Sequence, residues 1–392
     1  MRFFLADPNL YDAGGHNMDY AAEVAQAMTD RGAEVVVLSN RRFLASDRQL
    51  HVMPTFSMGL REGYPAIIRA SASLDQRWHR MMAKINPRRI QKPFEPLHFR
   101  AKVLISNLNR WLMASPIRPD DHWFFPTITW SDALHIGLWF KALSTRPARA
   151  DLVLRFDPPQ AVDQKAAMRR ALEGIEGVFL WVDTPELADA YGSFLRKPIN
   201  LIRMPFPRIV AATPSSATPY AIYLGESRRD KGFHHLPDFA RHIEMSSTGA
   251  NLFVQILGNS CKDSVVYRAK SALLASNSRQ LHLIHGGLST ADYNRYLENA
   301  AAVICLYDSD AYKLRSAGII TQAVSAGIPV IMTPKPCAPL AMIERNNCED
   351  LVFFTDTSIG ENLNALHLAL QVKQRFPRSV DCVDSWNAPW VR

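Results

Sequence analysis

The stretch from Ala302 to Thr333 constrains the fold more than any other part of the chain. It begins with a short apolar run, AVICLY, and ends with a second one, Ile328–Thr333, and both are typical of buried strands. The apolar residues between these runs recur at helical spacing: Ile319, Ile320, Ala323 and Val324. Ser316 is expected to cap this helix and Gly327 to end it. The order of strand, loop, helix and strand predicts an α/β fold with a parallel sheet.

The start of that helix is a candidate anion site, because the first N–H groups of a helix are unpaired and lie at its positive dipole end. Arg315 stands directly before Ser316, Gly318 lies in the first turn, and Tyr312 is three residues upstream of Arg315. The pattern fits a phosphate cradle. It fits equally an ordinary buried α/β unit with a surface arginine, and the spacing alone leaves both readings open.

A glycine-containing loop follows the first predicted strand, Arg2–Ala6. It ends in Gly14, Gly15 and His16, and a helical pattern and the apolar run Glu34–Ser39 then complete a βαβ unit. The glycines lack the full GxGxxG pattern, which argues against a classical dinucleotide site. They would let a ligand approach the backbone, or they serve only a loop that needs positive φ angles. His16 either contacts that ligand or bonds within the loop.

Residues 75–120 form a basic amphipathic insertion. Between Gln76 and Arg118 ten lysines and arginines face a single acid, Glu95, with aromatic and aliphatic residues interleaved. Such a segment suits an anionic membrane surface or a phosphorylated acceptor, and a solvated face over ordinary core helices is the other reading. Nucleic acid is not expected, because no helix-turn-helix, zinc or RNA-binding signature accompanies the charge.

Asp157 follows another predicted strand, Asp151–Phe156, and two prolines after it rule out a helix at that point. Its carboxylate could act on a substrate or could cap the turn. Farther along, residues 205–219 are rich in Pro, Ala, Ser and Thr and read as a linker. We therefore expect an N-terminal domain (1–204), a second α/β domain (220–375) and a tail (376–392), whose two tryptophans predict docking on the N-terminal domain.

Composition excludes several classes of protein. The chain has 392 residues, a formal net charge of +8 and five cysteines with no CxxC pair. We interpret the cysteines as reduced thiols of a cytoplasmic protein and not as a disulfide framework or a zinc site. No apolar run is long enough to predict a transmembrane helix or a signal peptide.

In order and spacing, these features resemble the GT-B glycosyltransferases, most closely the retaining enzymes of the family 1/family 4 type, over essentially the whole chain. Gly14-Gly15-His16 occupies the position of the family's glycine loop. In the family's basic turn, Gly225 and Lys231-Gly232 match, whereas Glu226 stands at the arginine position. The resemblance implies that Arg228 or Arg229 replaces that arginine.

The second conserved element of the family also has a counterpart here. Its A-x-x-x-G-x-P-V pattern is matched by Ala323, Gly327, Pro329 and Val330. Tyr312, Arg315 and Gly318 fit the form of a related subgroup. Leu314 and Gln322 stand where the family has two glutamates, one on the donor sugar and one on its ribose. Gln322 is either a ribose contact or a polar residue on an exposed helix edge, and the identity of the donor sugar stays open.

The resemblance implies two Rossmann-like domains facing each other across a cleft, the first binding an acceptor and the second a nucleotide diphosphate sugar. The implied reaction is a metal-independent hexosyl transfer, without a cofactor and with retention, to a lipid-linked or cell-surface polysaccharide acceptor at the inner face of the cell membrane. His16 and Asp157 are the expected catalytic residues. The expected donor-binding residues are Gly14, Gly15, Arg228, Arg229, Lys231, Tyr312, Arg315, Ser316, Gly318 and Gln322. A sugar-nucleotide epimerase of the same fold and a non-catalytic nucleotide-sugar or glycan-binding protein are the alternatives.

Overall fold

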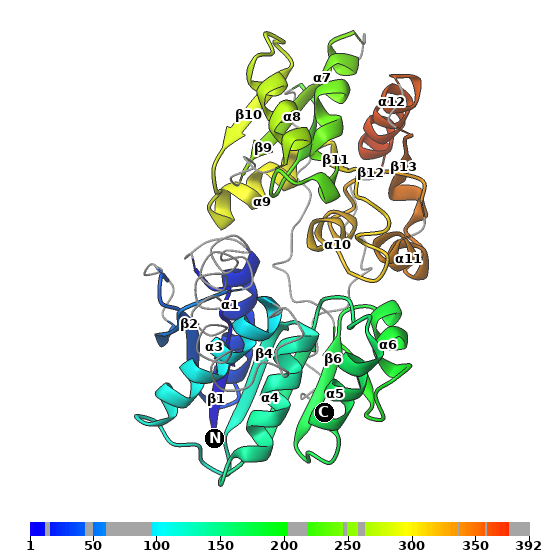
Figure 1. The fold of residues 1–392 in the computed structure, drawn as a ribbon. Helices are drawn as coiled ribbons and strands as arrows, with labels where there is room; N and C mark the ends of the chain where they lie inside the picture. The colour runs from blue at the N-terminus through cyan, green and yellow to red at the C-terminus, as the bar shows by residue number, and fades with distance from the viewer. Residues whose placement is uncertain are drawn as a thin grey trace, which may run out of the picture. The chain divides into compact units, whose positions relative to one another are not determined.

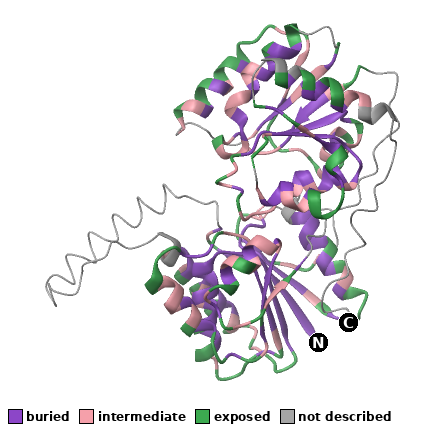
Figure 2. Cartoon of the chain, turned by 90° about the vertical axis from the view of Figure 1, so that its right-hand side faces the viewer, coloured by how far each residue is buried: buried purple, intermediate pink, exposed green. Residues whose placement is uncertain are grey.

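A computed structural model describes residues 1–11, 16–43, 50–59, 96–202, 218–245, 249–257, 263–335, 337–356 and 359–375. Two compact units divide the chain, Met1–Ala13 with Tyr20–Ile202 and Gly14–Asp19 with Arg203–Arg392. Each unit has one parallel sheet with helices packed against it (Figure 1). The strands are largely buried, whereas the helices are buried mainly on one side (Figure 2). This confirms the predicted α/β class.

The sheet of the first unit has seven strands in the order β3-β2-β1-β4-β5-β6-β7. β1 pairs in parallel with both β2 and β4, so that Phe4 lies beside Val36 on one side and Trp123 on the other. The strands are β1 (Arg2–Ala6), β2 (Glu34–Asn40), β3 (Val52–Phe56), β4 (His122–Ile128), β5 (Arg149–Leu154), β6 (Val178–Val182) and β7 (Ile199–Leu201). The chain changes direction of winding at β1, which places a topological switch point between β1 and β4.

The helices of this unit are α1 (His16–Thr29), α3 (Pro96–Leu112), α4 (Trp130–Ala142), α5 (Val162–Leu172) and α6 (Pro185–Gly192). The sequence pattern predicts Ser131 as the cap of the fourth helix, and this is wrong. Thr129 is the N-cap, and it forms a capping box with Asp132. A cap is defined by its extended backbone, and Thr129 has that geometry while Ser131 is already helical.

Aromatic rings fill the core under α3. Phe4 and Trp123 have ring centroids 4.8 Å apart, and Trp111 lies 5.5 Å from Trp123. Leu104 and Leu108 of the same helix are buried as well. The apolar stripe of α3 therefore faces the core. This agrees with the interpretation of this part of the segment as an ordinary core helix whose basic face is solvated. Residues 76–95 of the basic insertion lie outside the described part of the chain.

The second unit has a six-stranded parallel sheet in the order β10-β9-β8-β11-β12-β13. Its strands are β8 (Tyr220–Tyr223), β9 (Asn251–Ile256), β10 (Leu281–His285), β11 (Ala302–Cys305), β12 (Val330–Met332) and β13 (Val352–Phe354). Its helices are α7 (Leu236–Met245), α8 (Ser264–Leu274), α9 (Thr290–Asn299), α10 (Gly318–Ser325), α11 (Ala338–Arg345) and α12 (Ile359–Arg375), with short 3-10 turns η1 (Arg229–Lys231), η2 (Phe233–His235) and η3 (Glu349–Leu351).

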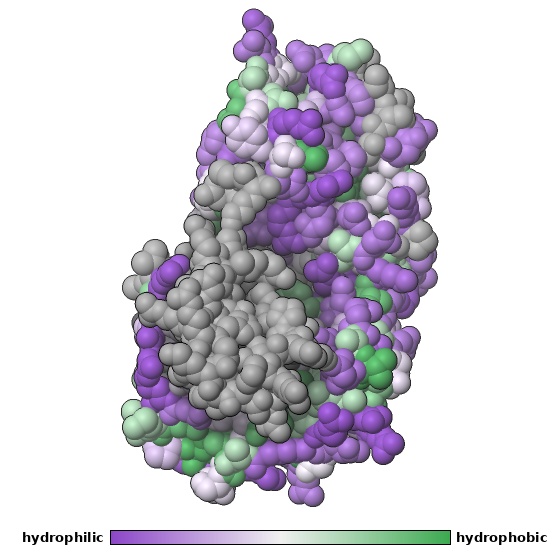
Figure 3. All heavy atoms as spheres, in the orientation of Figure 1, coloured by the Kyte–Doolittle hydropathy of each residue, from purple (hydrophilic) through white to green (hydrophobic). Residues whose placement is uncertain are grey.

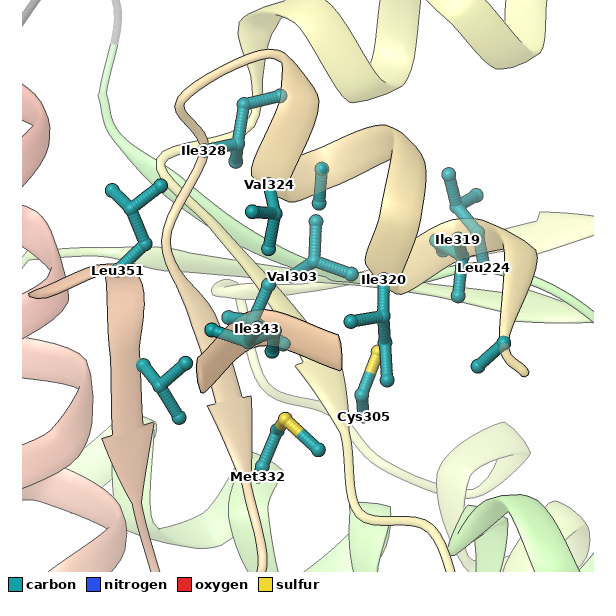
Figure 4. Packing of buried hydrophobic residues seen from close by; sticks show 14 of the residues in the cluster. Leu224, Val303, Cys305, Ile319, Ile320, Val324, Ile328, Met332, Ile343 and Leu351 are labelled. Atoms are coloured by element: carbon teal, nitrogen blue, oxygen red, sulfur yellow. The ribbon is translucent and has the colours of Figure 1, made fainter. Parts of the chain in front are cut away.

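The stretch from Ala302 to Thr333 forms the predicted strand, loop, helix and strand. Ile320 and Val324 point from α10 toward Val303 and Cys305 on β11 (Figure 4). Gly327 has a φ of +70°, which is the left-handed conformation expected at the end of a helix. The predicted cap is wrong, because the N-cap of α10 is Ala317 and not Ser316.

Two elements escape the sequence pattern, β3 and α11. Pro54 lies within β3, and a proline argues against a strand except at the edge of a sheet, which is where β3 lies. α11 has a proline in its first turn, a position where the missing N–H costs nothing. The linker up to residue 217 and the tail (376–392) lie outside the described residues.

The expectation that all five cysteines are reduced is wrong, as Cys348 shows. Cys305 and Cys337 are free thiols, whereas Cys348 is disulfide-bonded. Within the described part of the chain, no helix is long and apolar enough to cross a membrane.

Candidate functional site

The carboxyl ends of β8 and β11 form the switch point of the second unit. β8 is the first strand of its sheet, with β9 on one side and β11 on the other. Ligands of open α/β sheets bind outside the carboxyl ends of the strands at such a point. The loops after the two strands are tied together, since the N–H of Asp308 donates to the carbonyl oxygen of Asp230 at 2.9 Å.

Gly232 makes this close approach possible. It has a φ of +73°, and a Cβ atom there would lie 2.0 Å from the carbonyl oxygen of Leu306. A side chain at this position would therefore push the two loops apart. Glycine, which adopts positive φ without strain, keeps the basic turn after β8 against the end of β11.

Lys231 places a cation at the same edge. Its Nζ atom lies 3.0 Å from the point that a Cβ on Gly225 would occupy, so the ammonium group rests against the glycine turn that follows β8. The side chain is half-buried. Burial raises the pKa of Cys305, the last residue of β11, to about 12, and the charge of Lys231 opposes that shift. The ammonium group therefore acts on both sides of the switch point.

Arg228 is balanced by two carboxylates of its own turn. Its guanidinium donates to Glu226 at 3.2 Å and to both carboxylate oxygens of Asp230. The hydrogen bonds to Asp230 raise the pKa of Arg228 above its usual range, and the charges of Asp230 and Glu226 add to that shift. Burial would raise the pKa of Asp230, but the hydrogen bonds and charge of Arg228 lower it, and Lys231 adds to the effect. Arg229 is exposed on η1. Of the three expected cations, Lys231 is thus the one held against the glycine turn.

Arg315 and Tyr312 lie on the loop between β11 and α10. The Nε of Arg315 donates to the carbonyl oxygen of Ala311 at 2.9 Å, and its guanidinium carbon lies 5.4 Å from the centroid of the Tyr312 ring. Its charge also lowers the pKa of Asp230. Burial raises the pKa of Tyr312 to about 12, so its hydroxyl stays protonated at neutral pH. Arg315 and Lys231 therefore both act on the turn around Asp230.

Ser316, Gly318 and Gln322 lie along the start of α10. Ser316 lies directly before the N-cap and Gly318 is the first residue of the helix, and both are half-buried. Gln322 is buried, with 7% of its surface exposed, and its Oε1 accepts a hydrogen bond from the hydroxyl of Tyr293 on α9 at 3.0 Å. The alternative of a polar residue on an exposed helix edge is therefore wrong. A contact of Gln322 with a ribose stays a prediction.

Gln255 is a site residue that the sequence analysis missed. It lies on β9 and is 3% exposed. Its Oε1 accepts from the N–H of Gly225 at 2.8 Å, and its Nε2 donates to the carbonyl oxygen of Gly286 after β10, also at 2.8 Å. One buried amide thus fixes two loops at the carboxyl edge. The signal was present as a lone polar residue in the apolar run LFVQIL.

Of the site residues expected in the N-terminal domain, only some lie within the described part of the chain. Gly14 and Gly15 lie outside the described residues. His16 is the first residue of α1. Asp157 is exposed beyond the end of β5. Burial raises the pKa of Tyr191, and the charge of Asp157 adds to that shift, so the carboxylate lies near this tyrosine. That His16 and Asp157 are catalytic stays a prediction.

No cluster of three or more His, Cys, Asp or Glu side chains within the described ranges could hold a metal ion. Hydrophilic side chains cover most of the described surface on the face shown in Figure 3. The chemistry that the second unit offers at this edge is that of an anion site: the ammonium group of Lys231 beside the Gly225 turn, and the guanidinium group of Arg315, whose charge acts on the same turn.

No protein-family model matches the chain, and no curated protein does. Solved structures match it over nearly its whole length. Sucrose-phosphate synthase from Thermosynechococcus elongatus has 11% sequence identity and a TM-score of 0.63, with 100% of this chain and 96% of that one covered. HepE from Anabaena, in complex with UDP and glucose, has 11% identity and a TM-score of 0.59, covering 96% and 94%.

WaaG, a glycosyltransferase involved in lipopolysaccharide biosynthesis, is also similar, with 12% identity and a TM-score of 0.55 over 98% of this chain and 96% of that one. At such identities the likeness establishes the fold and not the activity. These neighbours are GT-B glycosyltransferases. The chain therefore has the GT-B fold, which confirms the predicted fold class.

Proposed function

We propose that the chain is a glycosyltransferase that moves a hexosyl group from a nucleotide diphosphate sugar to a glycan or lipid-linked acceptor. The observation that carries this proposal is the position of Lys231, whose Nζ rests against the Gly225 turn at the switch point of the second sheet. A diphosphate bound there would contact a cation and could approach the backbone of the Gly225 turn closely. Phosphate oxygens require both kinds of contact.

The proposed reaction breaks the bond between the sugar and the diphosphate. Negative charge then grows on the leaving phosphate oxygen, and fixed cations that stabilise it lower the barrier. Lys231 and Arg315 are the groups to which we assign this role, since both already act on the carboxylate of Asp230. Arg228 orders the turn instead, because its charge is matched by Glu226 and Asp230. We propose no metal ion and no cofactor for this step.

The donor and acceptor are the finer part of the proposal. HepE was solved with UDP and glucose, and this supports a uridine diphosphate sugar as the first donor to test. The role of WaaG in lipopolysaccharide biosynthesis supports a lipid-linked or cell-surface glycan as acceptor. We further propose retention of configuration, with His16 near the junction of donor and acceptor and Asp157 on the acceptor side. We propose that the protein works at the inner face of the membrane, which it contacts through residues 76–118.

The full-length protein should be incubated with radiolabelled UDP- and GDP-sugars and a membrane extract. Transfer of label to extractable lipid or polysaccharide supports the proposal. Isomerised free donor would identify an epimerase, and saturable nucleotide binding without turnover would identify a binding protein. Co-sedimentation with anionic liposomes at low salt tests the membrane contact separately, and protein that stays in the supernatant argues against it.

A further inference from the structure

A buried polar cluster lies at the carboxyl edge of the first sheet, formed by residues that directly follow three strands and one from a neighbouring helix. Asp7 follows β1, Arg155 follows β5 and Asp183 follows β6. The Nε of Arg155 donates to Oδ2 of Asp183 at 3.1 Å. The charge of Arg155 also lowers the pKa of Asp7, so the three groups lie close enough to interact. Open α/β sheets bind ligands at this edge.

Tyr20 reaches this cluster from α1. Its ring is stacked on Phe124 of β4, with centroids 6.2 Å apart and an interplanar angle of 7°. Burial raises the pKa of Tyr20, and the charges of Arg155, Asp7 and Asp183 act on its hydroxyl. The side chain is 4% exposed, yet among the described residues its hydroxyl has no hydrogen-bond partner. A buried hydroxyl without a partner is costly, which points to a partner that binds.

The charges of the cluster limit what that partner can be. One guanidinium, already bound to Asp183, faces two carboxylates. Asp7 also accepts a hydrogen bond from the N–H of Asn9 at 2.8 Å. A phosphate would meet these carboxylates at close range and be repelled. A hydroxyl both donates and accepts, so it can bond to a carboxylate and to a phenol at once.

We propose that Asp7, Tyr20, Arg155 and Asp183 bind a hydroxyl group of an uncharged sugar acceptor, with Tyr20 supplying a hydrogen bond that it makes only in the complex. The proposal rests on the proposed function, and it narrows the acceptor to a sugar that carries no phosphate near the bound hydroxyl. Arg155 is the more exposed residue of its ion pair with Asp183, with 18% of its side chain exposed against 3%.

The test uses the full-length protein, UDP-glucose as donor, and glucose, N-acetylglucosamine and glucose 6-phosphate as acceptor probes. UDP release and direct binding of each probe are measured for the wild type, Tyr20→Phe and Tyr220→Phe. The last variant is a matched control, since it deletes the hydroxyl of another tyrosine, which donates to the carbonyl oxygen of Tyr296 in the second unit. We expect the uncharged probes to be preferred at least tenfold over glucose 6-phosphate.

Tyr20→Phe should raise the KM for the uncharged acceptor about tenfold and leave the KM for UDP-glucose unchanged. It should raise the unfolding midpoint of the free protein, because a buried hydroxyl without a partner is removed. Tyr220→Phe should alter neither KM. The proposal is overturned by a preference for glucose 6-phosphate, by an unchanged acceptor KM in Tyr20→Phe, which would mean that water alone satisfies the hydroxyl, or by a protein that binds UDP but neither uncharged probe. Absence of UDP binding in the wild type would instead overturn the proposed function.

Discussion

Tyr293 donates its hydroxyl hydrogen to Oε1 of Gln322 at 3.0 Å, joining α9 to α10 beneath the switch point of the second unit. Burial raises the pKa of Tyr293 above its usual range, so the phenol is protonated and can donate at neutral pH. With one oxygen lone pair engaged, the amide group of Gln322 keeps its NH₂ donors for another partner. The rotamer of Gln322 is therefore set by a residue on a different helix.

Removing that hydroxyl tests whether Gln322 serves the nucleotide. Tyr293→Phe should weaken UDP binding about fivefold, roughly 1 kcal/mol, because the amide loses its fixed orientation. Calorimetric titration with UDP measures the change, and a double-mutant cycle with Gln322→Ala shows whether the two side chains act together. Additive effects of the two substitutions would mean that Tyr293 does not act through Gln322.

Lys231 is the cation whose loss should matter most. Lys231→Ala is expected to weaken UDP binding at least tenfold, about 1.4 kcal/mol, and to reduce the salt dependence of the affinity, since a charge near the diphosphate is removed. Arg268, an exposed cation on α8, provides the control, and Arg268→Ala should bind UDP as the wild type does. Equal affinities in the wild type and Lys231→Ala would rule out a contact with the diphosphate.

Gly232→Ala should destabilise the second unit. The residue has a φ of +73°, and the added Cβ would lie 2.0 Å from the carbonyl oxygen of Leu306. Strain and overlap together should cost roughly 2–4 kcal/mol in the free energy of unfolding. Gly249→Ala is a close control, because Gly249 has a φ of +62° with nothing within 4 Å of the added atom, and it should cost only about 1 kcal/mol. Urea unfolding compares the two, and similar losses would show that the contact with Leu306 is not tight.

The buried pair of Arg100 and Asp132 supports the start of α4. Arg100 donates to the carboxylate of Asp132 and, at 3.1 Å, to the hydroxyl of Thr129. Asp132→Ala leaves Arg100 buried without its counterion, so it should cost about 3–5 kcal/mol in the free energy of unfolding. Asp189→Ala, at an exposed position on α6, should change it by less than about 0.5 kcal/mol. A small loss for Asp132→Ala would mean that water reaches the guanidinium.

Asp7 should make the stability of the first unit depend on pH. Burial raises its pKa from 3.8 to about 6, against the lowering effect of its hydrogen bond to Asn9 and of Arg155. Because the folded protein holds this proton more tightly than the unfolded chain, the contribution of Asp7 to stability is fully present below pH 3.8 and is lost as the pH rises through 6. The loss amounts to about 3 kcal/mol, at roughly 1.4 kcal/mol per pH unit.

Asp7→Asn keeps an acceptor for the N–H of Asn9 but cannot ionise. The free energy of unfolding of this variant should therefore not show the decrease that ionisation of Asp7 causes in the wild type between pH 4 and 6. Urea unfolding at both pH values measures the difference. If the stabilities of the variant and the wild type change with pH in the same way, ionising Asp7 costs no free energy in the folded protein. Solvent would then reach its carboxylate.

Hydrophobic periodicity predicted most strands and helices, because the apolar positions that define each period are the ones that the core buries. It failed at β3, where Pro54 is tolerated only because the strand lies at the edge of its sheet. It also misplaced two caps, since Ser131 and Ser316 have suitable side chains but the extended backbone belongs to Thr129 and Ala317. Side-chain chemistry alone does not fix where a helix begins.

The candidate site could be predicted only where its residues lie close together in the sequence. Lys231 and Gly232 were predicted from their match to the basic turn of the GT-B family, and Arg315 and Gly318 from their positions at the predicted start of a helix. The ion pairs that occupy Arg228 and the bonds that Gln255 makes to the Gly225 turn and to Gly286 depend on how the loops come together. The cluster around Asp7 and Tyr20 unites strand ends that only the topology of the sheet brings side by side.

The hydrogen bond from Asp308 to Asp230 joins two loops that lie far apart in the sequence. The cradle at the switch point therefore cannot form from a fragment that lacks either β8 or β11, and it exists only after these two strands have paired. Contacts of such long sequence separation form slowly. A nucleotide that binds there would recognise the finished sheet and not its precursors, so during synthesis in the cell the donor would act as a selective stabiliser of correctly folded chains.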